Sequence, residues 1–71
     1  MEDGKVYKVV ELVGSSPTSW EDAIHSIVAK ASKSIRDLRV VEVVKLDVRL
    51  EDDKVKAFRA KVNLSFKLEE D

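Results

Sequence analysis

The last third of the chain alternates strictly between apolar and polar residues, and this pattern limits the possible folds more than any other feature. The apolar positions are Phe58, Ala60, Val62, Leu64, Phe66 and Leu68. The polar positions between them are Arg59, Lys61, Asn63, Ser65 and Lys67. Because successive side chains of a β-strand point to opposite faces, the pattern predicts a long strand with one face toward a core and one polar face.

A second long strand is predicted just before it. Residues from about Val40 to Leu50 are rich in β-branched side chains, and the acidic stretch 51–54 separates them from the last strand, expected from about Val55 to Leu68. Two such strands joined by a short polar turn form a β-hairpin. The carboxylates of Glu51, Asp52 and Asp53 do not have the spacing of a calcium loop, so we interpret them as a solvated hairpin tip.

The alternation of the second strand contains one fault. Every second residue from Val44 to Leu50 is apolar, but the next position of this series toward the N-terminus is Glu42, a carboxylate. One extra residue would restore the pattern, and we therefore predict a β-bulge between Glu42 and Val44. With the bulge, Val41 and Val43 would point into the core, and Val40 and Glu42 would lie on the polar face.

A helix is predicted between the first strand and the hairpin. Apolar residues recur there at steps of three and four and form one stripe, which consists of Trp20, Ala23, Ile24, Ile27, Val28, Ala31, Ile35 and Leu38. Thr18 and Glu21 fit a capping box, so the helix should start there and extend to about Leu38. Trp20 lies on the stripe, which indicates packing in a core or interface.

The first strand is predicted from Lys5 to Val13, before the interruption at Gly14 to Pro17. A strand, a crossover helix and a hairpin give the order β-α-β-β, and the right-handed crossover rule places the first strand beside the third. The sequence therefore predicts an α+β fold in one domain, residues 1–71, with a three-stranded antiparallel sheet packed on one helix.

So small a unit is not expected to stand alone. A chain of 71 residues buries only about 60% of its unfolded surface. It has no Cys, which excludes disulfides and thiolate metal sites. The second face of the sheet would carry Val9, Val13 and Val40 among charged groups, a mixture that suits a subunit interface or a wet pocket. We therefore predict self-association.

Several function classes are not expected. A net charge of −1 gives no field that would attract nucleic acid or anionic lipid, and no exposed aromatics accompany the basic residues Arg49, Arg59, Lys61 and Lys67. No apolar run reaches the roughly 20 residues of a membrane span. The acidic start, residues 1–4, does not resemble a signal peptide, so a cytoplasmic location is the expectation.

Enzymatic activity is not expected either. Nucleophilic catalysis needs a base within hydrogen-bond reach of an activated Ser or Cys. The one imidazole, His25, is predicted on the outward side of the helix, and no catalytic triad can be assembled.

Several segments resemble the dodecin family. They are Val6-Tyr7-Lys8-Val9, Glu11-Leu12-Val13-Gly14-Ser15-Ser16, the helix, Arg39 to Val43, and Val62 to Glu69. The resemblance implies a three-stranded antiparallel sheet wrapped on one helix and a hollow homododecamer of cubic symmetry. It also implies flavins stacked in pairs between tryptophans of neighbouring subunits, and storage instead of turnover.

The flavin-binding residues of the family are replaced in this chain. Val40 stands at the position of the stacking tryptophan, Arg59 at that of the glutamine that binds the edge of the flavin ring, and Asp47 at that of a basic residue. Without an aromatic face, a stacking contribution of about 0.5–1.5 kcal/mol per contact is lost. Arg59 can instead pair with Glu42 or Asp47 and close the pocket.

These replacements resemble the dodecin branch that lacks the tryptophan, for which calcium binding has been proposed. Calcium would then be held by Glu42 and Asp47. Our leading hypothesis is a non-enzymatic dodecin-like storage protein whose altered site, at Val40, Glu42, Asp47 and Arg59, binds flavin weakly or takes a cation or small anion instead.

Two alternatives stay open. One is a working storage protein for riboflavin or FMN, and the other is a purely structural assembly module whose polar face is filled by ion pairs. The sequence does not identify the natural ligand.

Overall fold

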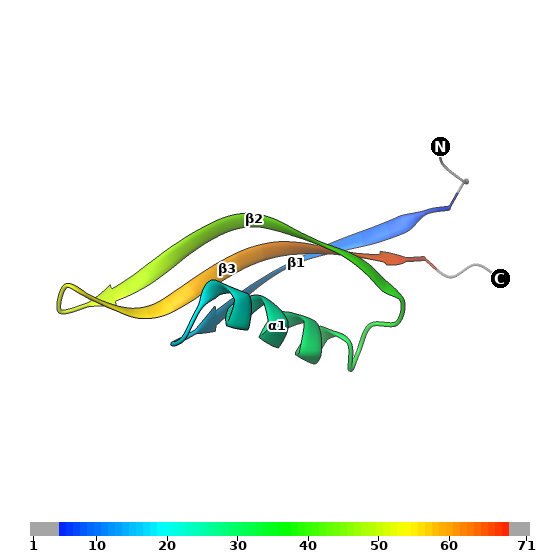
Figure 1. Ribbon diagram of the computed structural model, residues 1–71. Helices are drawn as coiled ribbons and strands as arrows, with labels where there is room; N and C mark the ends of the chain where they lie inside the picture. The colour runs from blue at the N-terminus through cyan, green and yellow to red at the C-terminus, as the bar shows by residue number, and fades with distance from the viewer. Residues whose placement is uncertain (1–4, 69–71) are drawn as a thin grey trace.

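The computed structural model describes residues 5–68, which form one antiparallel sheet with a helix against it (Figure 1). In chain order the elements are β1 (Tyr7–Ser16), α1 (Trp20–Ala31), β2 (Leu38–Glu51) and β3 (Lys54–Lys67). β3 lies between the other two strands and is antiparallel to both. The predicted β-α-β-β fold, with the first strand beside the third, is confirmed. The acidic start at 1–4 and Glu69 lie outside the described residues.

The alternation of β3 separates a core face from a polar face, as predicted. Ala60, Val62 and Leu64 on the side of α1 are completely buried. They form the core with Ala23, Ile27 and Ala31 of α1. We call this side of the sheet the helix face and the opposite side the outer face.

α1 begins one residue later than the predicted capping box would place it. The N-cap is Ser19, whose hydroxyl accepts the backbone N–H of Asp22 at 3.0 Å, so the assignment of Thr18 and Glu21 as the cap is wrong. The buried Ser16 decides the position. Its hydroxyl accepts the N–H of Thr18 at 2.9 Å and donates to the Asp22 carboxylate at 2.7 Å.

α1 also ends earlier than predicted, at Ala31 instead of near Leu38. A turn follows, and Asp37, with a φ of 59°, leads the chain into β2. Ile35 and Leu38 nevertheless pack against the core. The apolar stripe thus identified core residues correctly but assigned the last of them to the wrong element. No helix within residues 5–68 is long and apolar enough to cross a membrane.

β1 continues through Gly14 to Ser16, beyond the predicted end at Val13. Gly14 is needed because α1 passes close above it. A Cβ at this position would lie 2.7 Å from Cδ1 of Ile27 and 3.1 Å from the carbonyl oxygen of Ala23. The glycine that we expected to end the strand instead allows the helix to approach it.

The predicted bulge in β2 is present at the end of the expected interval. Val44 is the extra residue, between the pairs Val43–Val62 and Lys45–Lys61. The outer face receives Val40 and Glu42 as expected. The prediction that Val43 enters the core is wrong, because its side chain is 44% exposed.

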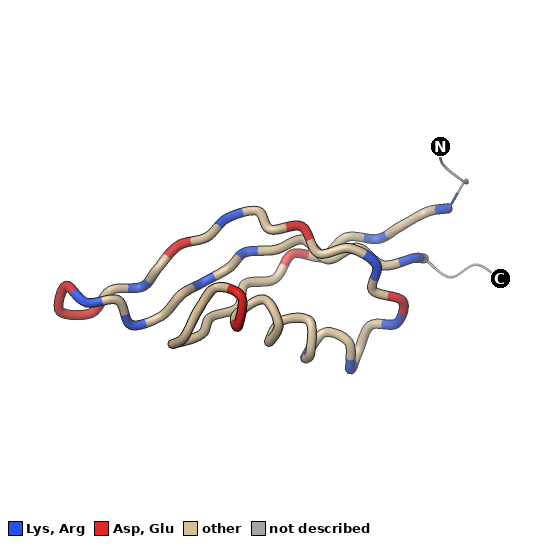
Figure 2. The backbone as a smooth tube through the Cα atoms, viewed as in Figure 1, with Lys and Arg blue, Asp and Glu red and all other residues tan. Residues whose placement is uncertain are grey.

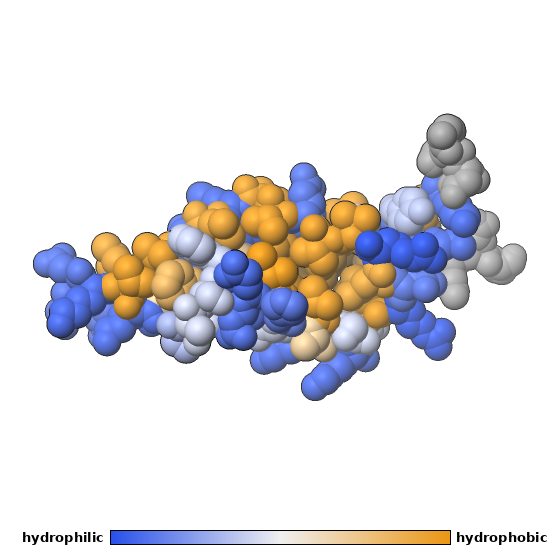
Figure 3. All heavy atoms as spheres, viewed as in Figure 1, coloured by the Kyte–Doolittle hydropathy of each residue, from blue (hydrophilic) through white to orange (hydrophobic). Residues whose placement is uncertain are grey.

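α1 packs mainly on β1 and β3 and leaves most of the helix face of β2 beyond Val41 uncovered. The hairpin of β2 and β3 also extends past the end of the helix (Figure 1). An apolar stripe is therefore bare, each residue being between 38% and 58% exposed: Val44, Leu46, Val48, Leu50 and Val55. Figure 3 shows apolar surface from the middle of the molecule toward this hairpin.

Candidate functional site

The outer face is organised in rows of side chains that run across the three strands. Residues paired in an antiparallel ladder point to the same face, so each row takes one residue from each strand. In the order β1, β3, β2, the rows are Val9, Ser65, Val40; Glu11, Asn63, Glu42; Val13, Lys61, Lys45; and Ser15, Arg59, Asp47. Basic and acidic positions accordingly alternate along β2 (Figure 2). All four predicted site residues lie on this face.

Arg59 and Asp47 form the closest ion pair that the described residues make on the outer face. The guanidinium donates from Nε to Oδ1 at 2.8 Å and from Nη2 to Oδ2 at 2.9 Å, a two-point geometry that is stronger than a single contact. Of the two carboxylates that we considered as partners, Arg59 takes Asp47, which lies directly opposite in the ladder. The site thus has an arginine whose charge is largely neutralised.

The pair shifts the titration of both groups. The hydrogen bonds from Arg59 lower the pKa of the Asp47 carboxyl; partial desolvation opposes this, and the charges of Arg59 and Lys45 add to it. The same hydrogen bonds, together with the charge of Asp47, raise the pKa of Arg59. Both groups are therefore charged at neutral pH.

Trp20 supports this pair from the other side of the sheet. Its indole N–H donates to the backbone carbonyl of Asp47 at 3.0 Å, and its ring meets Phe58 edge to face with centroids 5.2 Å apart. The packing role predicted for Trp20 is confirmed. That this packing also holds the backbone of the site could not be predicted from the residue pattern.

Glu42 lies apart from Asp47. It accepts a hydrogen bond from the Asn63 amide at 3.4 Å, and two ladder rows, or about 13 Å of strand, separate the two carboxylates. Calcium ligands lie about 2.3–2.6 Å from the ion, so one subunit does not bring Glu42 and Asp47 to a shared ion. Within residues 5–68 no group of three or more His, Cys, Asp or Glu is placed to hold a metal.

Lys45 and Lys61 lie between these carboxylates and were missed as a pair. They face each other across the ladder and line a small pocket of about 160 Å³ with Val13, Asp47 and Arg59. A plain count back from the hairpin turn would pair Lys45 with Ala60. The register shift between Arg49 and Leu50 moves it opposite Lys61, and the sequence showed no signal of that shift.

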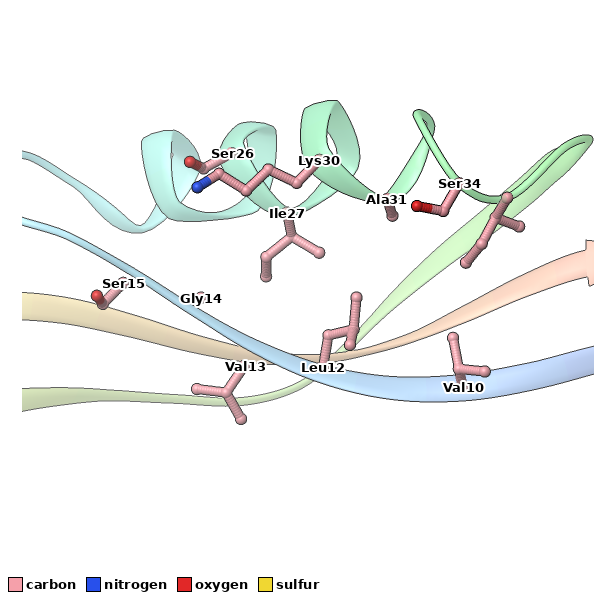
Figure 4. Close-up of a pocket in the computed structure, with 11 residues that line it drawn as sticks. Val10, Leu12, Val13, Gly14, Ser15, Ser26, Ile27, Lys30, Ala31 and Ser34 are labelled. Carbon is pink, nitrogen blue, oxygen red and sulfur yellow. The ribbon is translucent and has the colours of Figure 1, made fainter.

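A larger hollow of about 650 Å³ lies on the helix face, between β1 and α1. Val10 and Leu12 point into it from the strand and Ile27 from the helix (Figure 4). Its one titratable side chain is Lys30, so the hollow offers apolar contact and little chemistry. His25 is exposed on α1. The outer face is therefore the better candidate for a ligand site.

Comparison with known proteins gives a consistent result. A family model described as Dodecin matches residues 6–69. Calcium dodecin of Mycobacterium tuberculosis is 40% identical over 63 residues, 89% of each chain. Dodecin of Thermus thermophilus is 40% identical over 67 residues, 94% of this chain and 97% of the relative.

Solved structures agree. The dodecin of Streptomyces coelicolor superposes with a TM-score of 0.91 at 33% identity, over 99% of this chain and 100% of the other. The Mycobacterium tuberculosis protein, described as calcium-chelating and with a novel calcium-binding site, superposes with a TM-score of 0.81 at 39% identity, over 90% and 91%.

Proposed function

Because the chain belongs to the dodecin family, whose members are binding proteins and not enzymes, we propose that it stores or sequesters a small ligand in a hollow homododecamer. We place the ligand site on the outer face, around Val40, Glu42, Asp47 and Arg59. We further propose that this site has lost most of its affinity for flavin.

The two-point pair of Arg59 with Asp47 is the observation that carries this proposal. Nε and Nη2 of Arg59 already donate to Asp47, so these donors do not serve the edge of a flavin ring. Val40, 55% exposed, provides no aromatic face on which a flavin could stack. The outer face therefore offers a flavin neither of its two main contacts.

Titration with riboflavin tests the proposal, because flavin fluorescence is quenched when the ring stacks in a binding site. We expect no tight quenching. Saturable quenching at micromolar riboflavin or below would contradict the proposal and favour the first alternative, a working flavin-storage dodecin.

The pocket beside the ion pair favours ligand binding over a purely structural role. A sheet face that served only to join subunits would be filled by its ion pairs, with no hollow next to them. Here the ordered Arg59–Asp47 pair borders a pocket of about 160 Å³.

Calcium is a second candidate ligand because a relative of 40% identity is a calcium dodecin. Glu42 and Asp47 would have to act in different sites or with ligands from other subunits, since they lie two rows apart. Calorimetric titration with calcium checks this, and Glu42→Gln and Asp47→Asn should each reduce the heat if their carboxylates bind the ion.

The shape of the subunit supports the proposed assembly. Its radius of gyration is 14.6 Å, against about 11 Å expected for a compact domain of this length. The bare apolar stripe on the β2–β3 hairpin and the apolar hollow beside β1 give it two surfaces suited to burial against other copies. Native mass spectrometry of the purified protein should show twelve subunits and any retained ligand.

A further inference from the structure

We propose that Lys45, Lys61 and Arg59 form a subsite for a small oxyanion, such as phosphate, on the outer face. The inference rests on the proposed function, because it names the chemical class that the ligand site recognises. It starts from a conflict in the sheet. Lys45 and Lys61 lie directly opposite each other in the β2–β3 ladder, and like charges in that position destabilise a sheet.

The neighbouring carboxylates do not fully resolve this conflict. Glu11 contacts Lys61 at 3.6 Å in an exposed ion pair, which is a weak interaction. Asp47 is held by Arg59. Lys45 forms no ion pair with any residue in the described part of the chain, 5–68. One ammonium group is thus left without a fixed counter-charge beside two other cations.

The pocket formed by these residues has the volume and the positive charge expected of a site for a small anion. It is lined by three cations and one carboxylate, with Val13 as its apolar wall, so the lining carries an excess of positive charge. Its volume of about 160 Å³ lies below the roughly 300–1,000 Å³ of pockets that enclose drug-sized ligands. A phosphate-sized group fits this description better than a flavin ring.

A change at Asp47 is expected to affect anion binding in the opposite direction from a change at either lysine. Its carboxylate repels an anion in the pocket and also occupies the guanidinium of Arg59. Replacing it with Asn removes the repulsion and releases donors of Arg59. We therefore expect Asp47→Asn to bind the anion more tightly, although it removes an ordered ion pair.

Inorganic phosphate titrated into the assembled protein tests this, with ionic strength held constant by NaCl and binding followed by the ³¹P line width. We expect broadening with the unaltered protein. Lys45→Gln and Lys61→Gln should each weaken binding about three- to tenfold, and Asp47→Asn should strengthen it. The matched control is Lys56→Gln, because Lys56 is exposed on β3 and does not line the pocket.

Three results would overturn the subsite: no broadening with the unaltered protein, no effect of Lys45→Gln, or an equal effect of Lys56→Gln. FMN and riboflavin, compared by fluorescence, distinguish the source of the anion. If FMN binds more tightly than riboflavin and Lys45→Gln abolishes this difference, the pocket holds the phosphate of a larger ligand. If FMN and riboflavin bind equally and inorganic phosphate is still broadened, the pocket holds a free anion.

The subsite and the proposed function fail in different measurements. Phosphate line widths report the subsite, whereas tight riboflavin quenching or a mass other than that of twelve subunits contradicts the proposed function. A chain that assembles, fails to quench riboflavin and also fails to broaden phosphate would refute the subsite alone.

Discussion

At the scale of single residues, Val40 limits what the outer face can bind. Its branched side chain lies in one row with Val9 and Ser65 and is 55% exposed, so there is room for a larger group. Replacing it with an aromatic residue adds the one type of contact that a flavin needs most and that this face lacks.

Val40→Trp should therefore increase the affinity for riboflavin. Each stacking contact is expected to strengthen binding about three- to tenfold, with the full gain only where two subunits bring their rings together. Fluorescence quenching of riboflavin measures it. Val6→Trp is the control, since Val6 is 56% exposed outside the four rows, and equal gains for both variants would show that position 40 is not part of the site.

Asp47 should make stability depend on acid pH. Arg59 lowers the pKa of its carboxyl in the folded protein, whereas the unfolded value is about 3.9. A group of this kind stabilises the fold fully above its unfolded pKa, and the contribution is lost as pH falls through the folded pKa. The unaltered protein should thus melt at a higher temperature than Asp47→Asn at neutral pH, and the difference should vanish in strong acid.

Thermal melting followed by the fluorescence of Trp20 measures this difference at each pH. Asp52→Asn is the control, because Asp52 lies at the hairpin tip with a φ of 52° that asparagine also accepts. A difference between the unaltered protein and Asp47→Asn that stays constant across pH would show that the ion pair does not stabilise the fold.

The sequence identified the residue types of the candidate site but not all of its contacts. Val40, Glu42, Asp47 and Arg59 could be placed on one face because strand alternation is local and regular. The choice of Asp47 as partner of Arg59, and the meeting of Lys45 with Lys61, depend on ladder register. Register here is set by bulges, which shift pairing by one residue. The bulge at Val44 interrupts the alternation and was predicted, whereas the shift between Arg49 and Leu50 has no counterpart in the sequence pattern.

At the scale of elements, α1 crosses closely over β1 at Gly14. Ile27 and the backbone of Ala23 fill the space that a side chain at this position would occupy. The neighbouring core is completely buried at Ala60 and Val62, so a shift of the helix away from Gly14 would open packed contacts there.

Gly14→Ala should therefore destabilise the protein by about 1–3 kcal/mol, as overpacking usually does. Chemical denaturation followed by circular dichroism measures the free energy of unfolding. Gly14→Ala combined with Ile27→Val, which removes Cδ1 of Ile27 but keeps the still closer Cγ1, should recover only a small part of the loss. If Gly14→Ala is as stable as the unaltered protein, the close approach of α1 to β1 is not tight in solution.

The sequence predicted the number, type and order of the elements, and it missed their ends. The helical stripe continues in periodicity to Leu38, but the chain leaves the helix at Ala31 and returns Ile35 and Leu38 to the same core by another path. Burial was predicted correctly there because hydrophobicity determines it. The element to which these residues belong was predicted wrongly, because the ends of the helix depend on the turn geometry at Asp37 and on the hydrogen bonds of Ser16.

At the scale of the whole molecule, one subunit cannot bury all the apolar surface of its own sheet. α1 is 12 residues long while β2 and β3 each have 14, and a helix rises less than half as far per residue as a strand. One helix therefore cannot cover this sheet. The apolar stripe on the β2–β3 hairpin is the part that needs a neighbouring copy.

Leu46→Asp should break the proposed assembly. Leu46 is 46% exposed in the single subunit, so a charge there would stay hydrated in a free subunit, but burying it unpaired in an interface is strongly unfavourable. Native mass spectrometry should show loss of the twelve-subunit species, as smaller folded particles or as unfolded chain. Lys56→Asp places the same group at an exposed position of the hairpin that is not one of the five stripe residues and should still assemble. A Leu46→Asp protein with the full mass would show that the stripe is not an interface.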